Sequence, residues 1–137
     1  MNAVDTQPMI ERFRRTYERF LSGEPSELLA FLDERVTYHL PGKHLGGGAL
    51  CGRVAILDRM RKAARACESP PRVELLHIAA HGPFIISFER VTASRLGRTL
   101  DQLASVVWLV EDGRCLEIWT HFADQAACDG FWRDLEV

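Results

Sequence analysis

The chain has 137 residues, of which 47% are hydrophobic and 26% charged, and a formal net charge of −2. This length and balance are those of one soluble globular domain that can bury a core and still enclose a small cavity. The sequence has no internal repeat or low-complexity stretch, its basic residues are not massed, and it has no run of 18 apolar residues that could span a membrane.

The start of the chain and the distribution of its charges limit its location and partners. Residues 1–7 are polar and lack the apolar core of a signal peptide, so we expect a cytoplasmic protein. The densest basic cluster falls on one predicted helix among apolar positions, as is typical of a solvated helix face (Arg59, Arg61, Lys62 and Arg65). We therefore expect neither nucleic acid nor a membrane as partner.

Helices come first along the chain. Apolar residues recur at helical spacing and predict an amphipathic helix from Thr6 or Gln7 to Ser22, stopped by Gly23 (Ile10, Phe13, Tyr17, Phe20 and Leu21). Pro25 suits the first turn of a second, shorter helix that carries Leu28, Leu29 and Leu32. A short strand is predicted at residues 35–40, and a loop with five glycines at 41–52.

A third helix follows that loop. It places Leu57, Met60, Ala64 and Cys67 on one face, and Pro70-Pro71 ends it. The loop run Gly46-Gly47-Gly48 lacks the GxxxxGK[ST] pattern of a phosphate loop, so a flexible lid over a pocket mouth is the better interpretation.

The rest of the chain reads as sheet. Four strands are predicted at residues 73–80, 84–93, 99–110 and 115–122, joined by turns at His81-Gly82-Pro83, Leu96-Gly97-Arg98 and Glu111-Asp112-Gly113. A last helix is predicted at 124–135. Strands joined in sequence by short turns make an antiparallel meander, and helices that precede it indicate an α+β architecture.

Cysteines and histidines give no metal pattern. Cys51, Cys67, Cys115 and Cys128 are widely spaced without a CxxC pair, so we expect reduced, buried thiols. His77 and His81 would lie about 13 Å apart on an extended segment, too far to share one ion. We expect no metal and no organic cofactor.

Two groups of motifs resemble a known family. The first is Val36-Thr37-Tyr38-His39-Leu40-Pro41-Gly42 followed by Gly52-Arg53; the second is Asp112-Gly113-Arg114, Glu117-x-Trp119, Asp124-Gln125 and Asp129-x-Phe131-Trp132. Together they resemble SnoaL-like, ketosteroid-isomerase-related proteins of the NTF2-like superfamily. The resemblance covers nearly the whole chain. It implies one domain over residues 1–137, an α+β cone in which a curved antiparallel sheet wraps around the N-terminal helices and leaves a central pocket.

The chain departs from the enzymatic members of that family at several positions. Ketosteroid isomerases carry a carboxylate base at the end of the first strand, where this chain has Tyr38-His39-Leu40-Pro41. Epoxide hydrolases of this fold use an Arg-x-Asp-like pair that feeds a second acid. Here Arg98 and Asp101 have the wrong spacing, and His121 stands near the second acid's position. Cyclase-type chemistry needs one acid/base group, which His39 or His121 could supply.

The resemblance predicts a concave site that contains Tyr17, His39, Trp119 and His121. The two histidines are the candidates for proton transfer, because they change charge near neutral pH. Asp124 either orients a histidine or, as helix capping favours, accepts from the first-turn amides of the last helix. The alternatives are a core tyrosine, a structural histidine, and a last strand shifted by one residue, which would turn His121 to the other face.

Three functions remain open from the sequence. One is a cofactor-free isomerase, cyclase or hydrolase that acts on an apolar small molecule; the others are a non-catalytic ligand carrier and a dimeric accessory domain. The strand at 99–110 is apolar on both faces, with Leu103, Val107 and Leu109 alternating with Ala104, Val106 and Trp108. We expect one of these faces to line the pocket and the other to be covered by a second copy in a homodimer.

Overall fold

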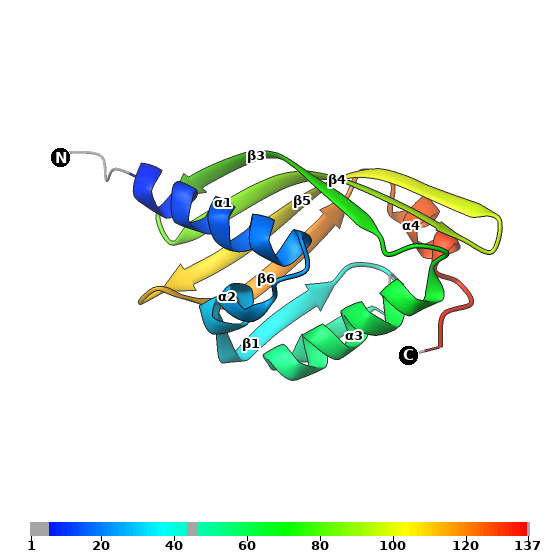
Figure 1. Cartoon of the computed structure of the whole chain (residues 1–137), viewed down its shortest axis with the longest axis horizontal. Helices are drawn as coiled ribbons and strands as arrows, with labels where there is room; N and C mark the ends of the chain where they lie inside the picture. Colours follow the sequence, from blue (N-terminus) through cyan, green and yellow to red (C-terminus); the bar gives the residue numbers. More distant parts are fainter. Residues whose placement is uncertain (1–5, 44–46, 137) are drawn as a thin grey trace.

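The computed structural model describes residues 6–43 and 47–136, and their fold is the predicted α+β class (Figure 1). The elements follow in the order α1 (Gln7–Leu21), α2 (Ser26–Phe31), β1 (Leu32–Leu40), β2 (Gly48–Cys51), α3 (Arg53–Ala66), β3 (Arg72–His81), β4 (Phe84–Arg95), β5 (Arg98–Glu111), β6 (Arg114–Phe122) and α4 (Gln125–Phe131). In this described part the strands form one sheet of order β2-β1-β6-β5-β4-β3.

The antiparallel meander is formed by β3 to β6, as the sequence predicts. The hairpin between β5 and β6 is tighter than expected, because Glu111 pairs with Arg114 and leaves a two-residue turn. Asp112 and Gly113 both have positive φ, at 51° and 75°, which fits a right-twisted hairpin and requires Gly or a tolerant residue such as Asp.

Two strands extend the meander on one side. β1 pairs in parallel with β6, with Tyr38 opposite Ile118. The prediction of loop structure throughout 41–52 is wrong, because Gly48–Cys51 forms strand β2 against β1, with Ala49 opposite His39. The sequence does not predict this strand, because the segment is rich in glycine, which has a low strand propensity. Residues 44–46 of the predicted lid lie outside the described residues.

The helices agree with the sequence except at three points. Leu32, predicted on the second helix, is instead the first residue of β1, because α2 ends at Phe31. The buried face of α3 contains Ile56 and Ala63, so the predicted face with Leu57 and Ala64 is displaced by one residue. The last helix is shorter than predicted: it begins after Asp124 and ends at Phe131, beyond which the chain turns at the buried Trp132. No helix in the described ranges is long and apolar enough to cross a membrane.

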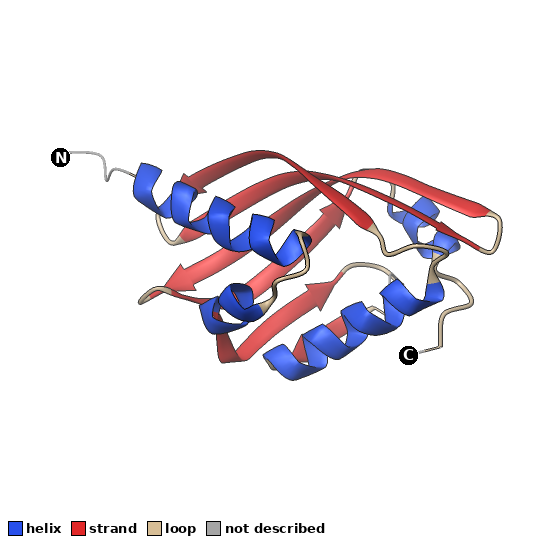
Figure 2. Ribbon diagram, viewed as in Figure 1, coloured by secondary structure: helices blue, strands red, loops and turns tan. Residues whose placement is uncertain are grey.

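Helices α1, α2 and α3 lie across one face of the curved sheet (Figure 2). Buried side chains divide into two clusters. The larger joins α1, α2 and the middle of the sheet, and the smaller joins α3, α4 and the strand ends near Leu40 and Leu100. Along β5 the residues Ala104, Val106 and Trp108 face the helices and are buried, whereas Leu103 on the outer face is 43% exposed. The predicted alternation of β5 is therefore confirmed.

Candidate acid–base site

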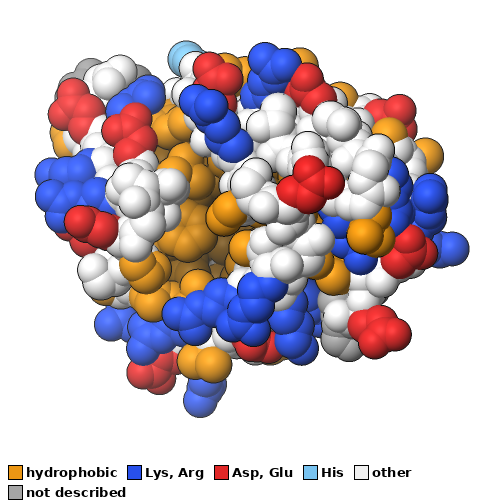
Figure 3. All heavy atoms as spheres, turned by 45° about the vertical axis from the view of Figure 1, so that its right-hand side comes forward, with side chains coloured by type: hydrophobic (Ala, Val, Ile, Leu, Met, Phe, Trp, Pro, Cys, Tyr) orange, Lys and Arg blue, Asp and Glu red, His pale blue; other side chains and the backbone are white. Residues whose placement is uncertain are grey.

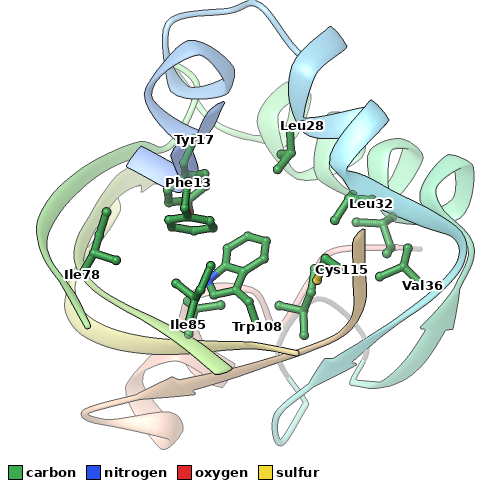
Figure 4. Packing of buried hydrophobic residues seen from close by; sticks show 12 residues of the cluster. Phe13, Tyr17, Leu28, Leu32, Val36, Ile78, Ile85, Trp108 and Cys115 are labelled. Atoms are coloured by element: carbon green, nitrogen blue, oxygen red, sulfur yellow. The ribbon is translucent and has the colours of Figure 1, made fainter. Parts of the chain in front are cut away.

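Aromatic rings from α1 and β5 meet at the centre of the larger cluster. The Phe13 and Trp108 ring centroids lie 5.0 Å apart with a 65° interplanar angle, and the Tyr17 and Trp108 centroids 5.4 Å apart at 70°. Such edge-to-face pairs pack tightly and hold each ring in one orientation. Figure 4 shows Phe13 and Tyr17 reaching from α1 toward Trp108, with Ile85 beside Trp108 on the sheet. These rings thus form a rigid, largely apolar wall in the interior between α1 and the sheet.

One carboxyl group lies in this apolar wall. Ile85, Ser87 and Glu89 are alternate residues of β4 that face the helices, and Glu89 is only 3% exposed. The Ser87 hydroxyl donates to Glu89 Oε1 at 3.0 Å and accepts from Trp108 Nε1 at 2.9 Å. The Tyr17 hydroxyl is also hydrogen-bonded to Glu89. A buried network therefore fixes the carboxyl group from α1, β4 and β5.

Burial raises the pKa of Glu89 from 4.5 to about 7, although the hydrogen bonds from Tyr17 and Ser87 oppose the rise. The cause is desolvation, which penalises the charged carboxylate in a medium of low polarity. Among the described residues Glu89 has no salt bridge that would restore its usual acidity. Protonated and ionised Glu89 therefore coexist near neutral pH, which is the condition for efficient general acid–base catalysis.

Two tyrosines accompany this carboxyl group and remain protonated. Burial, and secondarily the charge of Glu89, raises the pKa of Tyr17 well above its usual range. Burial also raises the pKa of Tyr38 to about 12, against the opposing effect of its hydrogen bond to Thr120. The Tyr38 hydroxyl and Thr120 Oγ1 lie 2.7 Å apart. Both tyrosines can therefore act as hydrogen-bond donors at neutral pH.

A hollow opens toward this interior. Three half-buried residues, Tyr38, Leu50 and Met60, pack against both buried clusters and so lie where the two clusters meet. Figure 3 shows a hollow lined by hydrophobic side chains, with a row of Lys and Arg along its lower edge, where α3 runs in Figure 1. An apolar ligand could enter here without displacing charged groups.

A second depression lies on the opposite side of α1 and is chemically different. It has a volume of about 420 Å³ and is lined by exposed, mostly charged side chains of that helix (Glu11, Arg14, Arg15, Glu18, Arg19 and Ser22). It is an open furrow along one helix and contains none of the buried network around Glu89. In the described ranges no three His, Cys, Asp or Glu side chains gather where they could hold a metal ion.

The structure separates the residues predicted to form one concave site. Tyr17 faces the interior, as expected. His39 and Trp119 are paired across β1 and β6 on the outer face of the sheet, where their rings stack with centroids 5.2 Å apart and a 6° interplanar angle. His39 Nε2 lies 2.9 Å from Glu117 Oε2, and His121 is exposed on the same outer face.

The prediction of a single site that joins Tyr17 to His39, Trp119 and His121 is therefore wrong in geometry. The reason is the period-two alternation of the strands. Tyr38 and Thr120 point inward, so the residues on either side of Thr120 point outward. The one-residue uncertainty left open by the sequence is settled in favour of the outer face.

Asp124 has the capping role that the sequence favoured. Its Oδ1 accepts from the Ala127 amide at 3.0 Å at the start of α4, and its own amide donates to Gln102 Oε1 at 3.0 Å. The carboxylate is thus engaged with the backbone of α4, and it is not part of the buried network.

Sequence reasoning missed Glu89. Its position carries a signal, because it is in phase with Ile85 and Ser87, which face the interior. That signal is weak, since Phe84, Ile86 and Phe88 make the opposite face of β4 equally apolar. The 3% exposure of Glu89, and its pairing with Ala104, a small buried residue of β5, show that this carboxyl group lies inside.

Comparison with known proteins identifies the family. Residues 13–118 match the SnoaL-like domain, and the chain belongs to this family. It is 29% identical over 124 residues to the uncharacterised protein Rv0034 of Mycobacterium tuberculosis, a match that covers 90% of this chain and 95% of that protein.

Two solved structures extend the comparison. Bal32a, from a soil-derived mobile gene cassette, is 32% identical with a TM-score of 0.83, and the match covers 90% of this chain and 95% of Bal32a. TerC, co-crystallised with polyporic acid, shares the fold at 20% identity and a TM-score of 0.77, over 93% of this chain and 100% of TerC.

Proposed function

We propose that this protein binds an apolar small molecule inside the cone and transfers a proton to or from it through Glu89, without a cofactor. The observation that carries the proposal is the Glu89 carboxyl group, which is 3% exposed in an otherwise apolar wall, where burial raises its pKa to about 7. Strongly perturbed titratable groups in a concave site are typical of catalytic acids and bases. TerC, a structural neighbour with the same fold, was co-crystallised with a small organic molecule, which supports a ligand of this kind here.

The neighbours of Glu89 define the reaction class. Ionised Glu89 can accept a proton from a carbon next to a carbonyl group and, once protonated, return it to another position of the same molecule. Tyr38 and Thr120 form a second hydroxyl pair on the same side of the sheet, where a hydroxyl can donate to the oxygen that gains negative charge. Proton transfer of this kind serves an isomerisation or an aldol-type ring closure.

Tyr17 and Ser87 hold Glu89 in place. Both hydrogen-bond to its carboxyl group, which favours the ionised form and keeps its pKa from rising further. The histidines predicted as acid/base groups contribute nothing to this scheme, because they lie on the outer face. In this proposal His39 acts with Glu117 and Trp119 as part of the sheet surface.

Hydrogen exchange tests the proposal directly. Small cyclic ketones are incubated with the protein in D₂O, and replacement of the protons next to the carbonyl is followed by NMR. We expect exchange above the buffer rate with the wild type, and a loss of about 10²–10⁴-fold with Glu89→Gln. His39→Ala and His121→Ala are matched controls and should retain full activity. Exchange that survives Glu89→Gln, or that disappears in either histidine variant, contradicts the assignment.

A non-catalytic carrier is the second candidate function, favoured by one specific observation. Glu89 is already hydrogen-bonded by Ser87 and Tyr17, so the network is satisfied without a substrate. A carrier would bind the same ketones, show no exchange above buffer, and keep its affinity in Glu89→Gln. Binding and exchange measured on the same samples therefore separate the two functions.

A further inference from the structure

The guanidinium group of Arg95 is buried and has no counter-charge within residues 6–43 and 47–136. Arg95 is the last residue of β4 and only 6% exposed. Among the described residues its Nε and Nη1 atoms have no hydrogen-bond partner. Burying a charged group without a partner is costly, so an anion placed against this guanidinium group would be stabilised.

Neighbouring arginines show that this state is particular to Arg95. On the adjacent strand Arg98 donates through Nη1 to the Gly130 carbonyl at 3.0 Å and through Nη2 to Asp134 Oδ2 at 2.6 Å. Arg90, further back along β4, makes a two-pronged contact with Asp101 at 2.9 and 2.7 Å. Both have a carboxylate partner, whereas the described residues provide none for Arg95.

The surroundings of Arg95 contain one nearby thiol and one exposed acid. Its positive charge opposes the burial that raises the pKa of the Cys67 thiol, which places the guanidinium beside the end of α3. Glu68 follows Cys67, is exposed, and is joined to β4 through its amide, which donates to the Ser94 carbonyl at 3.0 Å. No ion pair links the side chains of Glu68 and Arg95 in this part of the chain.

The same face of β4 connects Arg95 to the acid–base site. Glu89, Val91, Ala93 and Arg95 alternate along the strand and all point to the helix-covered side. Val91 and Ala93 are only partly buried and pack at the edge of the smaller cluster. At about 3.3 Å per residue, at most about 20 Å separates the α-carbons of Glu89 and Arg95. On this face of β4, two apolar side chains thus separate the buried carboxyl group of Glu89 from the guanidinium group of Arg95.

We propose that Arg95 binds the carboxylate or phosphate group of a ligand whose apolar body lies along Val91 and Ala93 toward Glu89. The planar guanidinium presents a fork of donors that matches both anions. This inference rests on the proposed function and narrows its substrate class to apolar molecules with an anionic end. A free inorganic anion could also bind the guanidinium group, and the experiment below distinguishes such an anion from the anionic end of an apolar ligand.

Three probes test the proposal on the full chain: decanoate, decanol of the same chain length, and inorganic phosphate at matched ionic strength. Calorimetric titration should show wild-type protein binding decanoate at least about tenfold more tightly than decanol, as one charge-assisted pair implies. Arg95→Met should abolish this preference and leave decanol binding unchanged. Arg90→Met, which removes an exposed arginine, is the matched control and should preserve the preference.

Thermal unfolding distinguishes a binding role from a structural one. Without anions, Arg95→Met should melt at or above the wild-type temperature, because an uncompensated buried charge is replaced by an apolar chain of similar length. If the variant instead melts several degrees lower and phosphate or decanoate affects it as they affect the wild type, Arg95 is structural and the proposal is overturned.

The remaining outcomes test the anion site separately from the proposed function. Equal binding of decanoate and decanol overturns the anion site and leaves the apolar cone intact. Phosphate binding that requires Arg95, with no binding of either amphiphile, supports an anion site for a free anion and contradicts an apolar ligand body along Val91 and Ala93. If none of the probes binds, the anion site is overturned, and the proposed function stands or falls with the ketone exchange.

Discussion

The ionisation of Glu89 makes a quantitative prediction about stability. The pKa of this carboxyl group rises from 4.5 to about 7 on folding. Between these pH values the folded state therefore binds more protons than the unfolded state. The contribution of Glu89 to the free energy of unfolding must fall as the pH rises from about 4.5, and it levels off above about 7. At about 1.4 kcal/mol per pKa unit the loss amounts to about 3 kcal/mol.

Glu89→Gln removes this titration while it keeps the shape of the side chain and an acceptor for Tyr17. Urea unfolding of both proteins is measured between pH 4.5 and 8.5, and the variant's free energy of unfolding minus that of the wild type is plotted against pH. Subtraction cancels the titrations that the two proteins share. We expect the difference to move in favour of the variant by about 3 kcal/mol between the two ends.

Tyr17→Phe provides a matched second perturbation. The Tyr17 hydrogen bond lowers the pKa of Glu89, so its removal should move the carboxyl titration to higher pH, as followed by the infrared carboxyl band. A stability difference for Glu89→Gln that stays flat within about 0.5 kcal/mol across the range would show that Glu89 is not desolvated in the folded protein. The acid–base proposal would then lose its basis.

Two further predictions concern the last helix and the outer face of the sheet. Asp124→Ala should lower the free energy of unfolding by about 1 kcal/mol, because the Ala127 amide loses its acceptor; urea unfolding that matches the wild type would contradict the capping role. We also propose that a second copy covers the outer face, where Phe88 and Leu103 are 37% and 43% exposed, to give a homodimer. Sedimentation should show a dimer at micromolar concentration and a monomer for Leu103→Glu, and a wild type that sediments only as a monomer refutes this.

The sequence by itself predicted most of the fold, for local reasons. The spacing of Phe13 and Tyr17 places both on the buried face of α1, and Asp-Gly defines the turn between β5 and β6. The motifs around Tyr38 and Trp119 pointed to the SnoaL-like family, which the match over residues 13–118 confirms. Such signals lie within one element, where periodicity and turn chemistry act directly.

Only the tertiary structure decided the site. Whether His121 or its neighbour Thr120 faces the interior depends on strand register, and a shift of one residue reverses the faces of a strand. Glu89 could not be recognised on a strand that is apolar on both sides. Its pKa depends on Tyr17, Ser87 and Trp108, which come from three elements that meet only on folding. Local sequence patterns specify the helices and strands, whereas the raised pKa of Glu89 arises from its burial where these elements pack together.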